Sequence, residues 1–255
     1  MKISIITVVY NNKATIQDAI HSVLSQDYDH LEYIIVDGAS TDGTVAVINE
    51  TMIHSKRNIK FISEKDNGIY DAMNKGIGLA TGDIVGILNS DDMYYSNDCL
   101  STVVREFQRK SVDAVFADLV YVYRENLEKV VRYYSSANFS PHKFAFGWMP
   151  AHPTFFVQRK CYEKYGKFKT DYAIAADYEL LIRFLVVHKI TYSYIPTVLV
   201  KMRMGGASTK NLKSNWVLNK EIVRACAENG IQTNMIKVFL KYPTKILQLV
   251  KKPTP

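Results

Sequence analysis

The sequence predicts an α/β fold in which a mostly parallel sheet is flanked by helices, with a helical extension at the carboxyl end. Apolar, β-branched runs at residues 3–10, 33–36 and 59–62 are typical of strands buried on both faces. The first two runs are followed by apolar residues at helical spacing. Because parallel neighbours need a crossover connection, usually a helix, this alternation favours a parallel sheet.

Further elements follow from the same patterns. An apolar run at residues 84–88 predicts another strand. Beyond residue 110 the alternation weakens, with a long strand expected at residues 113–123 and an irregular aromatic stretch at 130–148. Apolar residues at helical spacing predict helices over residues 16–24, 45–52, 99–107 and 177–185.

The run at residues 84–88 ends in an amide, a hydroxyl and two carboxylates: Asn89, Ser90, Asp91 and Asp92. In open α/β sheets, ligands bind outside the carboxyl ends of the strands. Adjacent carboxylates repel unless a cation joins them, and Mg²⁺ or Mn²⁺ is the usual partner of such oxygen ligands. The alternative is that these residues cap the helix that follows, since Ser and Asp are favoured caps.

Two more acids follow earlier strands of the predicted sheet. Asp37 comes directly after the second strand, and Asp66 comes shortly after the third. Because parallel strands end at one edge of the sheet, Asp37, Asp66 and Asp91 are expected to converge there. Residues 38–44 offer backbone donors to a ligand, or they form a tight turn in which Asp42 caps the next helix.

The second half of the chain supplies four further candidates. Trp148 and His152 lie in a loop-like segment. The indole could stack on a sugar or fill a small core, and the imidazole could act on a substrate or make a structural hydrogen bond. Arg203 and Ser208 flank two glycines after another apolar strand, in a segment that could close over phosphates or be an ordinary surface loop.

Asp177 is the candidate for a general base. It opens a strongly apolar helix, where a fixed carboxylate is well placed to hold a reacting hydroxyl group. The alternative is a simple helix N-cap. Leu180 stands where a capping box would carry Glu or Gln, so such a cap would lack its usual partner.

Composition and motifs exclude several classes of protein. With 255 residues, 47% of them hydrophobic, the chain can bury a full core. The cysteines, Cys99, Cys161 and Cys226, lack C-x-x-C spacing and predict neither a disulfide framework nor a zinc site. No phosphate loop of the G-x-x-x-x-G-K-S/T type is present, and the glycines near residue 78 lack the context of a dinucleotide site.

The tail over residues 231–255 is basic and apolar, with five lysines and no acid. Such a segment could lie on an anionic membrane surface or dock on the protein with its lysines in solvent. It lacks the aromatic-studded groove of a nucleic-acid site, so no nucleic-acid partner is expected. The amino terminus has no cleavage site and is too short to span a bilayer. We therefore expect a cytoplasmic protein, or one peripheral on the inner face of the plasma membrane.

Five blocks of the chain carry a family resemblance: residues 4–11, 36–44, 64–76, 88–92 and 176–180. In this order they are similar to family 2 glycosyltransferases of the GT-A fold, which add single sugars in bacterial polysaccharide, O-antigen and colanic-acid assembly. The resemblance covers nearly all of residues 1–210. It implies a glycosyltransferase domain there, with a nucleotide-sugar-binding half at 1–110 and an acceptor-binding half at 111–210, before a basic amphipathic helical extension at 211–255.

The resemblance also implies an inverting, metal-dependent transfer from a nucleotide-sugar, with UDP preferred, to a saccharide acceptor that could be lipid-linked. It gives the general-base role to Asp177, and Mg²⁺ or Mn²⁺ to Asp91 with Asp92. Many relatives carry Asp where this chain has Asn89, which leaves open the neighbour that shares the metal with Asp91. The nucleotide-sugar is assigned to Thr7, Val9, Tyr10, Asp37, Asp66, Lys75 and Asp91.

Two other functions would use the same residues. A nucleotidyltransferase could be built on a similar sheet and acidic metal site, but it would attack a phosphorus atom and would not need Asp177 opposite the metal. A non-catalytic module would bind a nucleotide-sugar without transferring the sugar. Replacing Asp177 therefore separates the first alternative from glycosyl transfer.

Overall fold

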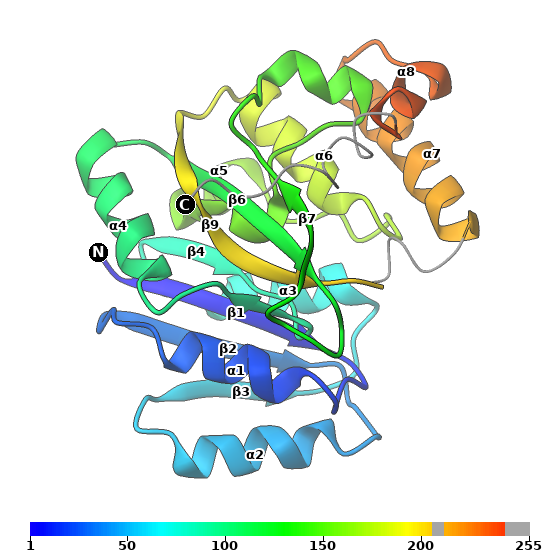
Figure 1. Cartoon of the computed structure of the whole chain (residues 1–255). Helices are drawn as coiled ribbons and strands as arrows, with labels where there is room; N and C mark the ends of the chain where they lie inside the picture. Colours follow the sequence, from blue (N-terminus) through cyan, green and yellow to red (C-terminus); the bar gives the residue numbers. More distant parts are fainter. Residues whose placement is uncertain (206–211, 243–255) are drawn as a thin grey trace.

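The computed structural model describes residues 1–205 and 212–242, and in this part of the chain nine strands form one mixed sheet (Figure 1). Helices cover both faces, which confirms the predicted α/β class. The strands are β1 (Ile3–Val9), β2 (Leu31–Asp37), β3 (Ile59–Ser63), β4 (Ile84–Ile87), β5 (Asp92–Tyr94), β6 (Ala114–Val122), β7 (Val130–Tyr134), β8 (Phe156–Gln158) and β9 (Tyr192–Arg203). The helices are α1 (Ile16–Leu24), α2 (Thr44–His54), α3 (Ile69–Leu79), α4 (Cys99–Lys110), α5 (Arg159–Tyr165), α6 (Ala176–Ile182), α7 (Leu212–Glu228) and α8 (Met235–Phe239).

The sheet has a parallel half and a mixed half. Strands β3, β2, β1 and β4 are neighbours in that order and all run parallel, as their helical crossovers require. Beyond them, β8 is antiparallel to both β4 and β6, whereas β9 is parallel to β6 and antiparallel to β5. The long strand expected at residues 113–123 is β6, and β7 pairs with it in an antiparallel hairpin.

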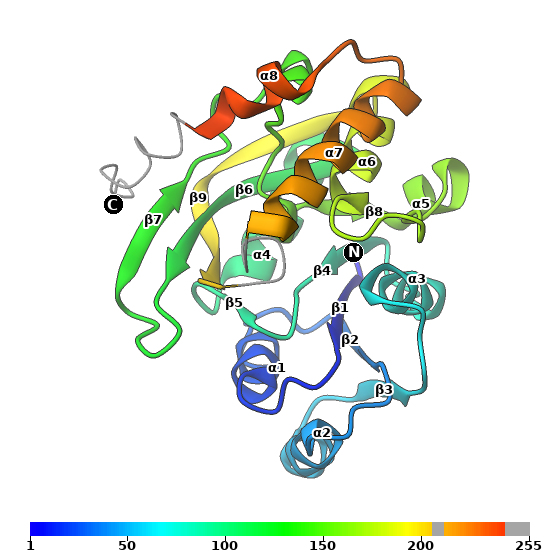
Figure 2. The ribbon, with the colours of Figure 1, turned by 90° about the vertical axis from the view of Figure 1, so that its right-hand side faces the viewer.

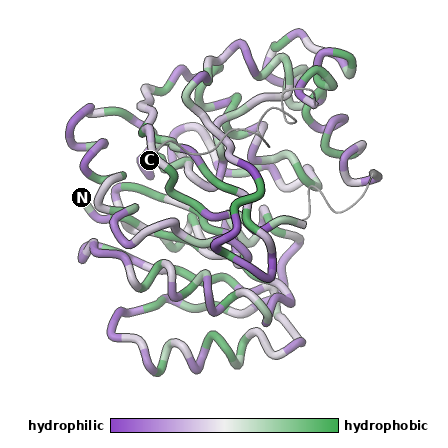
Figure 3. Tube along the Cα trace, in the orientation of Figure 1, coloured by the Kyte–Doolittle hydropathy of each residue, from purple (hydrophilic) through white to green (hydrophobic). Residues whose placement is uncertain are grey.

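Two hydrophobic clusters fill the space between the sheet and its helices. One lies beneath α1, α2 and α4, and the other lies on the opposite face beneath α3, α5, α6 and α7 (Figure 2). Hydrophobic residues accordingly gather along the central strands, while the outer helices and loops are largely hydrophilic (Figure 3). Gly76 lets α3 approach the sheet, since a Cβ atom there would lie 2.4 Å from Cγ2 of Ile6.

The edge of the sheet at which β2 begins is held by a buried carboxylate. Glu32 accepts hydrogen bonds from the ammonium groups of Lys2 and Lys60, at 2.9 and 2.8 Å, and from the Ser4 hydroxyl at 2.5 Å. Both the amide and the hydroxyl of Thr81 also donate to it. Burial alone would raise the pKa of Glu32, but the hydrogen bonds from Lys60, Ser4 and Thr81 hold it well below its usual range.

The helices after residue 211 pack onto the rest of the protein. Ile222, Ala225 and Cys226 of α7 and Val238 of α8 are buried in the cluster that also contains residues of α6. Helix α7 lies beside α6, and α8 lies beside α7 (Figures 1 and 2). Of the basic tail, residues 243–255 lie outside the described part of the chain. No helix within residues 1–205 and 212–242 combines the length and hydropathy needed to cross a bilayer.

Candidate active site

The loops that follow β1, β2 and β4 interlock at the carboxyl edge of the parallel half. The Asn12 side-chain amide donates to the Ser90 hydroxyl at 2.9 Å, and Thr15 donates to the Ser90 carbonyl at 2.9 Å. The Asn11 backbone amide donates to the Ser40 hydroxyl at 2.8 Å. These contacts join three segments that are far apart in sequence into one polar surface.

Asp37 lies on this surface, and its neighbour Gly38 approaches Asp66 closely. Asp37 is fully buried; its Oδ2 accepts from the Ser40 amide at 3.0 Å and the Ser63 hydroxyl at 2.7 Å, while its Oδ1 has no partner among the described residues. A Cβ atom on Gly38 would lie 2.5 Å from Oδ2 of Asp66, so glycine is what allows this close approach. The neighbouring Tyr10 ring is 64% exposed and free to cover a ligand.

Local capping accounts for one of the acids but not for the pair after β4. Asp42 accepts hydrogen bonds from the Thr44 amide at 2.9 Å and from its hydroxyl, which is turn chemistry at the start of α2. Helix α4, in contrast, begins at Cys99 with Asp98 as its N-cap residue. The capping alternative for residues 90–92 is therefore wrong, because Asp92 begins a strand, β5, and the helix starts only after Asp98.

The second of the two adjacent acids, Asp92, lies inside the protein. Asp92 is fully buried in β5, and its Oδ1 has no hydrogen-bond partner within the described chain. Burial, followed by the charge of Asp91, raises the pKa of Asp92 well above its ordinary value. Asn89 contacts Asp92 at 3.5 Å through its Nδ2 and leaves its own Oδ1 unpartnered in the same part of the structure. The loop thus holds buried oxygens that lack a donor.

Arg203 lies behind this loop. It is 3% exposed, forms an ion pair with Asp18 of α1, and donates to the Asp91 carbonyl at 2.9 Å. The structure therefore places Arg203 as an internal support of the acidic loop. Ser208, the other candidate from this segment, lies outside the described residues.

Three of the residues assigned to the nucleotide-sugar have partners within the protein. Thr7 is buried in β1 and accepts a hydrogen bond from the Tyr33 hydroxyl at 3.0 Å. Val9 is also buried, at the end of the same strand. The Lys75 ammonium lies 2.8 Å from Glu64 and 3.8 Å from Asp71.

Asp177 faces His152. The imidazole Nδ1 lies 3.3 Å from Oδ2 of Asp177, and the Oδ1 of Asp177 accepts from the Tyr178 amide at 2.8 Å. Ala175, not Asp177, is the N-cap residue of α6. Burial raises the pKa of Asp177 and the charge of His152 opposes that rise, so this carboxyl group accepts a proton more readily than an ordinary Asp.

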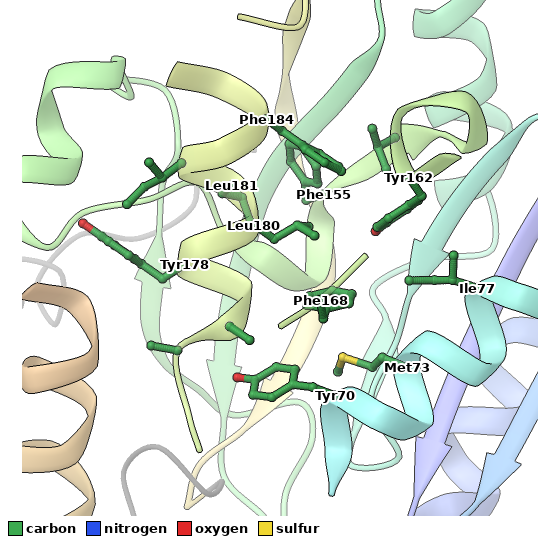
Figure 4. Close-up of a cluster of buried hydrophobic side chains, with 14 of the residues drawn as sticks. Tyr70, Met73, Ile77, Phe155, Tyr162, Phe168, Tyr178, Leu180, Leu181 and Phe184 are labelled. Carbon is green, nitrogen blue, oxygen red and sulfur yellow. The ribbon is translucent and has the colours of Figure 1, made fainter. Parts of the chain in front are cut away.

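A small pocket joins Asp177 to the acidic loop. Its polar lining is Asn89, His152 and Asp177, and its apolar lining comes from α3, α5, α6 and the segments around residues 155 and 168. The volume is about 30 Å³, room for a group the size of a water molecule. Figure 4 shows Met73 of α3 beside Phe168, with Leu180 and Leu181 of α6 above them. Asn89 and Asp177, from opposite halves of the chain, thus line one cavity.

Trp148 has a packing role in the structure. Its ring is half-buried and lies against that of Tyr134, with ring centroids 5.7 Å apart. It is not among the residues that line the pocket.

No sequence pattern predicts that a second carboxylate, that of Glu221, lies near Asp177. Glu221 of α7 accepts hydrogen bonds from the backbone amides of residues 173–175, directly before α6. An acid in the middle of an unremarkable helix cannot be assigned a partner so far away in sequence. Only the packing of α7 on this segment reveals it.

Comparison with known proteins agrees with this architecture. The family model described as glycosyl transferase family 2 matches residues 4–171, about two thirds of the chain. The chain belongs to glycosyl transferase family 2. Its match to the family model spans both halves of the pocket, including Asn89 and His152, and ends shortly before Asp177.

Several glycosyltransferases are similar over most of their length. A PGL/p-HBAD biosynthesis glycosyltransferase of Mycobacterium bovis is 25% identical over 222 residues, covering 87% of this chain and 82% of that protein. An uncharacterized glycosyltransferase of Mycobacterium tuberculosis is 30% identical over 187 residues, covering 72% of this chain and 69% of the relative. The chain is thus similar to glycosyltransferases over most of their length as well as its own.

Solved structures share the fold. S. aureus TarS 1-349 in complex with UDP-GlcNAc superimposes with a TM-score of 0.64 at 14% identity, over 88% of this chain and 66% of that one. A mannosyltransferase from Pyrobaculum calidifontis in complex with GDP-Man and Mn²⁺ gives a TM-score of 0.61 at 19% identity, over 99% of this chain and 81% of the other. These likenesses confirm the GT-A type of sheet.

Proposed function

We propose that the protein transfers a sugar from a nucleotide-sugar, preferably a UDP-sugar, to a hydroxyl group of a saccharide, with inversion at the anomeric carbon. The observation that carries the proposal is the pocket in which Asn89 of the acidic loop and the His152–Asp177 pair face one cavity. Family 2 membership supports it, as do the fold neighbours bound to UDP-GlcNAc and GDP-Man.

The donor would lie across the interlocked loops. Asp37 and Asp66 have the acceptor oxygens needed to bind the base and the ribose hydroxyls, and the unpartnered Oδ1 of Asp37 favours such a ligand. The exposed Tyr10 ring beside Gly38 is suited to stack on the base. Thr7, Val9 and Lys75 would act indirectly, by shaping the strand and the loop beneath the nucleotide.

The acidic loop fits a divalent cation. Asp91 would hold it, with the unpartnered oxygens of Asn89 or Asp92 as second ligands, although no group of three His, Cys, Asp or Glu side chains occurs among residues 1–205 and 212–242. Mg²⁺ and Mn²⁺ sites commonly complete such a partial set with substrate phosphates. A bound cation would neutralise the charge that develops on the leaving diphosphate. Removal of metal with EDTA should therefore weaken donor binding, and added Mn²⁺ should restore it.

Asp177 would act as the general base. It takes the proton of the acceptor hydroxyl while that oxygen attacks the anomeric carbon from the face opposite the nucleotide. The bond from that carbon to the diphosphate oxygen breaks, and the nucleoside diphosphate leaves. The imidazole of His152 lies beside this carboxylate, where it favours the ionised form and holds its orientation. Attack from the opposite face is what inverts the configuration.

The acceptor would be a saccharide carried on a lipid at the cytoplasmic face of the membrane. Ile236, Phe239 and Leu240 of the α8 segment are 76%, 42% and 55% exposed, beside the half-buried Lys237, which favours peripheral contact with anionic lipid. Replacing the three apolar residues with Ser should reduce sedimentation with phosphatidylglycerol vesicles. Unchanged sedimentation would contradict the membrane contact and leave the transfer reaction untouched.

The proposed reaction is tested by calorimetric titration with UDP-, GDP- and dTDP-sugars, with and without Mn²⁺, comparing the wild type with Asp91→Ala. Metal-dependent binding of one donor that the variant loses supports the donor site and names the donor. If no nucleotide-sugar binds under either condition, the proposal is wrong. A donor that binds without ever being transferred would indicate a binding module, and an active Asp177→Asn variant would indicate nucleotidyl transfer.

A further inference from the structure

The segment that leads to Asp177 is bound by a side chain from a different helix, α7. Residues 173–175 lead directly into α6, and Asp177 is the second residue of that helix. Any movement of this backbone therefore moves the carboxylate. Residues 173–175 belong to no helix or strand, so the position of Asp177 depends on the contacts that hold these three residues in place.

Glu221 of α7 fixes all three. Its Oε1 accepts from the Ala173 amide at 2.7 Å, and its Oε2 accepts from the amides of Ile174 and Ala175 at 2.8 and 2.9 Å. One carboxylate thus accepts charge-assisted hydrogen bonds from three consecutive backbone amides. On the other side, the Tyr70 hydroxyl of α3 donates to the Ile174 carbonyl, and Figure 4 shows Tyr70 reaching from α3 toward this segment.

The same face of α7 grips the residues just before this segment by side-chain contacts. Glu228 accepts from Lys169 at 2.8 Å and from the Tyr172 hydroxyl at 2.9 Å, and Arg224 forms an ion pair with Asp171. Glu228 therefore has the same charge as Glu221, lies on the same helix and binds the same stretch of chain before α6. It differs in that it does not touch the backbone at residues 173–175.

We propose that Glu221 is a positioning residue for the catalytic base: through the backbone of residues 173–175 it sets the distance and orientation of Asp177. This inference rests on the proposed function of Asp177. It assigns to the helix after residue 211 a part in positioning the base, which the family resemblance over residues 1–210 does not provide.

The negative charge of Glu221 also affects Asp177, and this effect can be measured in the pH profile of transfer. The charged or titratable groups facing Asp177 are His152 from the loop after β7, Tyr70 from α3 and Glu221 from α7. The negative charge of Glu221 raises the pKa of Asp177, so its removal lowers that pKa. Because the base must be ionised to react, the acidic limb of the pH profile moves to lower pH in Glu221→Gln.

The test compares wild type, Glu221→Gln, Glu221→Asp and the matched control Glu228→Gln, all as the full chain. In Glu221→Gln we expect kcat to fall about 10- to 100-fold with donor KM unchanged, since misplacing a reacting group by about 1 Å costs that much. The acidic limb should move to lower pH. Glu221→Asp retains the charge but not the reach, so its kcat should fall without movement of the limb. Glu228→Gln should keep wild-type kcat while lowering Tm.

Hydrogen exchange supplies a readout that needs no activity. The amides of residues 173–175 should exchange about tenfold faster in Glu221→Gln than in Glu228→Gln, because only the former replaces one of the two oxygens that accept from them with an NH2 group and removes the negative charge. Equal exchange in the two variants, or wild-type kcat and pH profile in Glu221→Gln, would overturn the positioning role. If the wild type transferred no sugar at all, the proposed function would fail, and the exchange rates alone would still decide whether Glu221 holds this segment.

Discussion

The proposed donor side and the proposed base side of the site are built in different ways. On the donor side, Asp37, Asp66 and Asp91 each follow a strand of the parallel half, and the loops after β2 and β4 both bond to the loop after β1. On the base side, Asp177 depends on His152 and on Glu221, which come from separate elements of the mixed half and of α7. The first arrangement follows from sheet topology, whereas the second follows from tertiary packing alone. Changes on the two sides should therefore have separable effects.

The largest effect is expected at the base. Asp177→Asn keeps the shape of the side chain but removes the group that accepts the proton, so transfer should fall about 10³-fold. Folding should be preserved, because the amide oxygen can still accept from the Tyr178 amide. Steady-state release of nucleoside diphosphate in the presence of acceptor measures the loss. An Asn variant with more than a tenth of wild-type activity would contradict the assignment of Asp177.

Glu32→Gln should separate stability from function on the donor side. Loss of the charge weakens the hydrogen bonds from Lys60, Ser4 and Thr81, so the free energy of unfolding should fall by about 2 kcal/mol in urea titrations. The folded-state pKa of Glu32 is depressed, so its contribution is complete above the unfolded-state value of about 4.3 and is lost as the pH falls below it. The stability difference between variant and wild type should shrink in acid.

The exposed Glu50 of α2 offers the control for this prediction. Glu50→Gln should leave the free energy of unfolding within about 0.5 kcal/mol of wild type, as is usual for surface positions. Donor affinity should be unchanged in both variants, since Glu32 lies at the far edge of the sheet. A stability loss that is the same at all pH values would argue against an ionised Glu32.

Gly38→Ala should weaken donor binding without disturbing the base. The added Cβ would lie 2.5 Å from Oδ2 of Asp66 and must displace that carboxylate. We expect about tenfold weaker donor affinity by calorimetry, within the usual range for an overpacked site. Gly78→Ala is the control, because its Cβ would meet only the flexible end of Lys167, at 3.3 Å. Equal affinities in the two variants would remove Asp66 from the donor site.

The smallest expected effect is at His152. The charge of His152 lowers the pKa of Asp177, so His152→Gln should raise it. The acidic limb of kcat/KM should then move to higher pH, with a loss of only a few-fold at pH values above that limb. Donor affinity should not change. A limb that moves to lower pH would mean that His152 acts on Asp177 in some other way.

The difference between the two sides also explains what the sequence could predict. The parallel strands, their helices and the acids at their ends follow from apolar runs and from the rule that parallel strands end at one edge. The capping interpretation of residues 90–92 is wrong because a short strand, β5, begins at Asp92 and α4 begins only at Cys99, and so short a strand leaves no pattern in the sequence. The roles assigned to the site residues remain predictions.

The base side could be predicted only in part. Asp177 stands out at the start of an apolar helix, but its contact with His152 and the grip of Glu221 on residues 173–175 join segments that no local pattern connects. Arg203 illustrates the same limit: a cation beside glycines suggests a surface loop, yet packing buries it against Asp18. Such contacts are properties of the assembled fold.

Donor binding to Asp177→Asn and Asp91→Ala, measured by calorimetry beside transfer by the same samples, tests the separation of the two sides most directly. The account predicts that Asp177→Asn binds the donor like wild type while transferring almost none, and that Asp91→Ala loses binding and transfer together. Loss of donor binding in Asp177→Asn, or wild-type binding in Asp91→Ala, would contradict it.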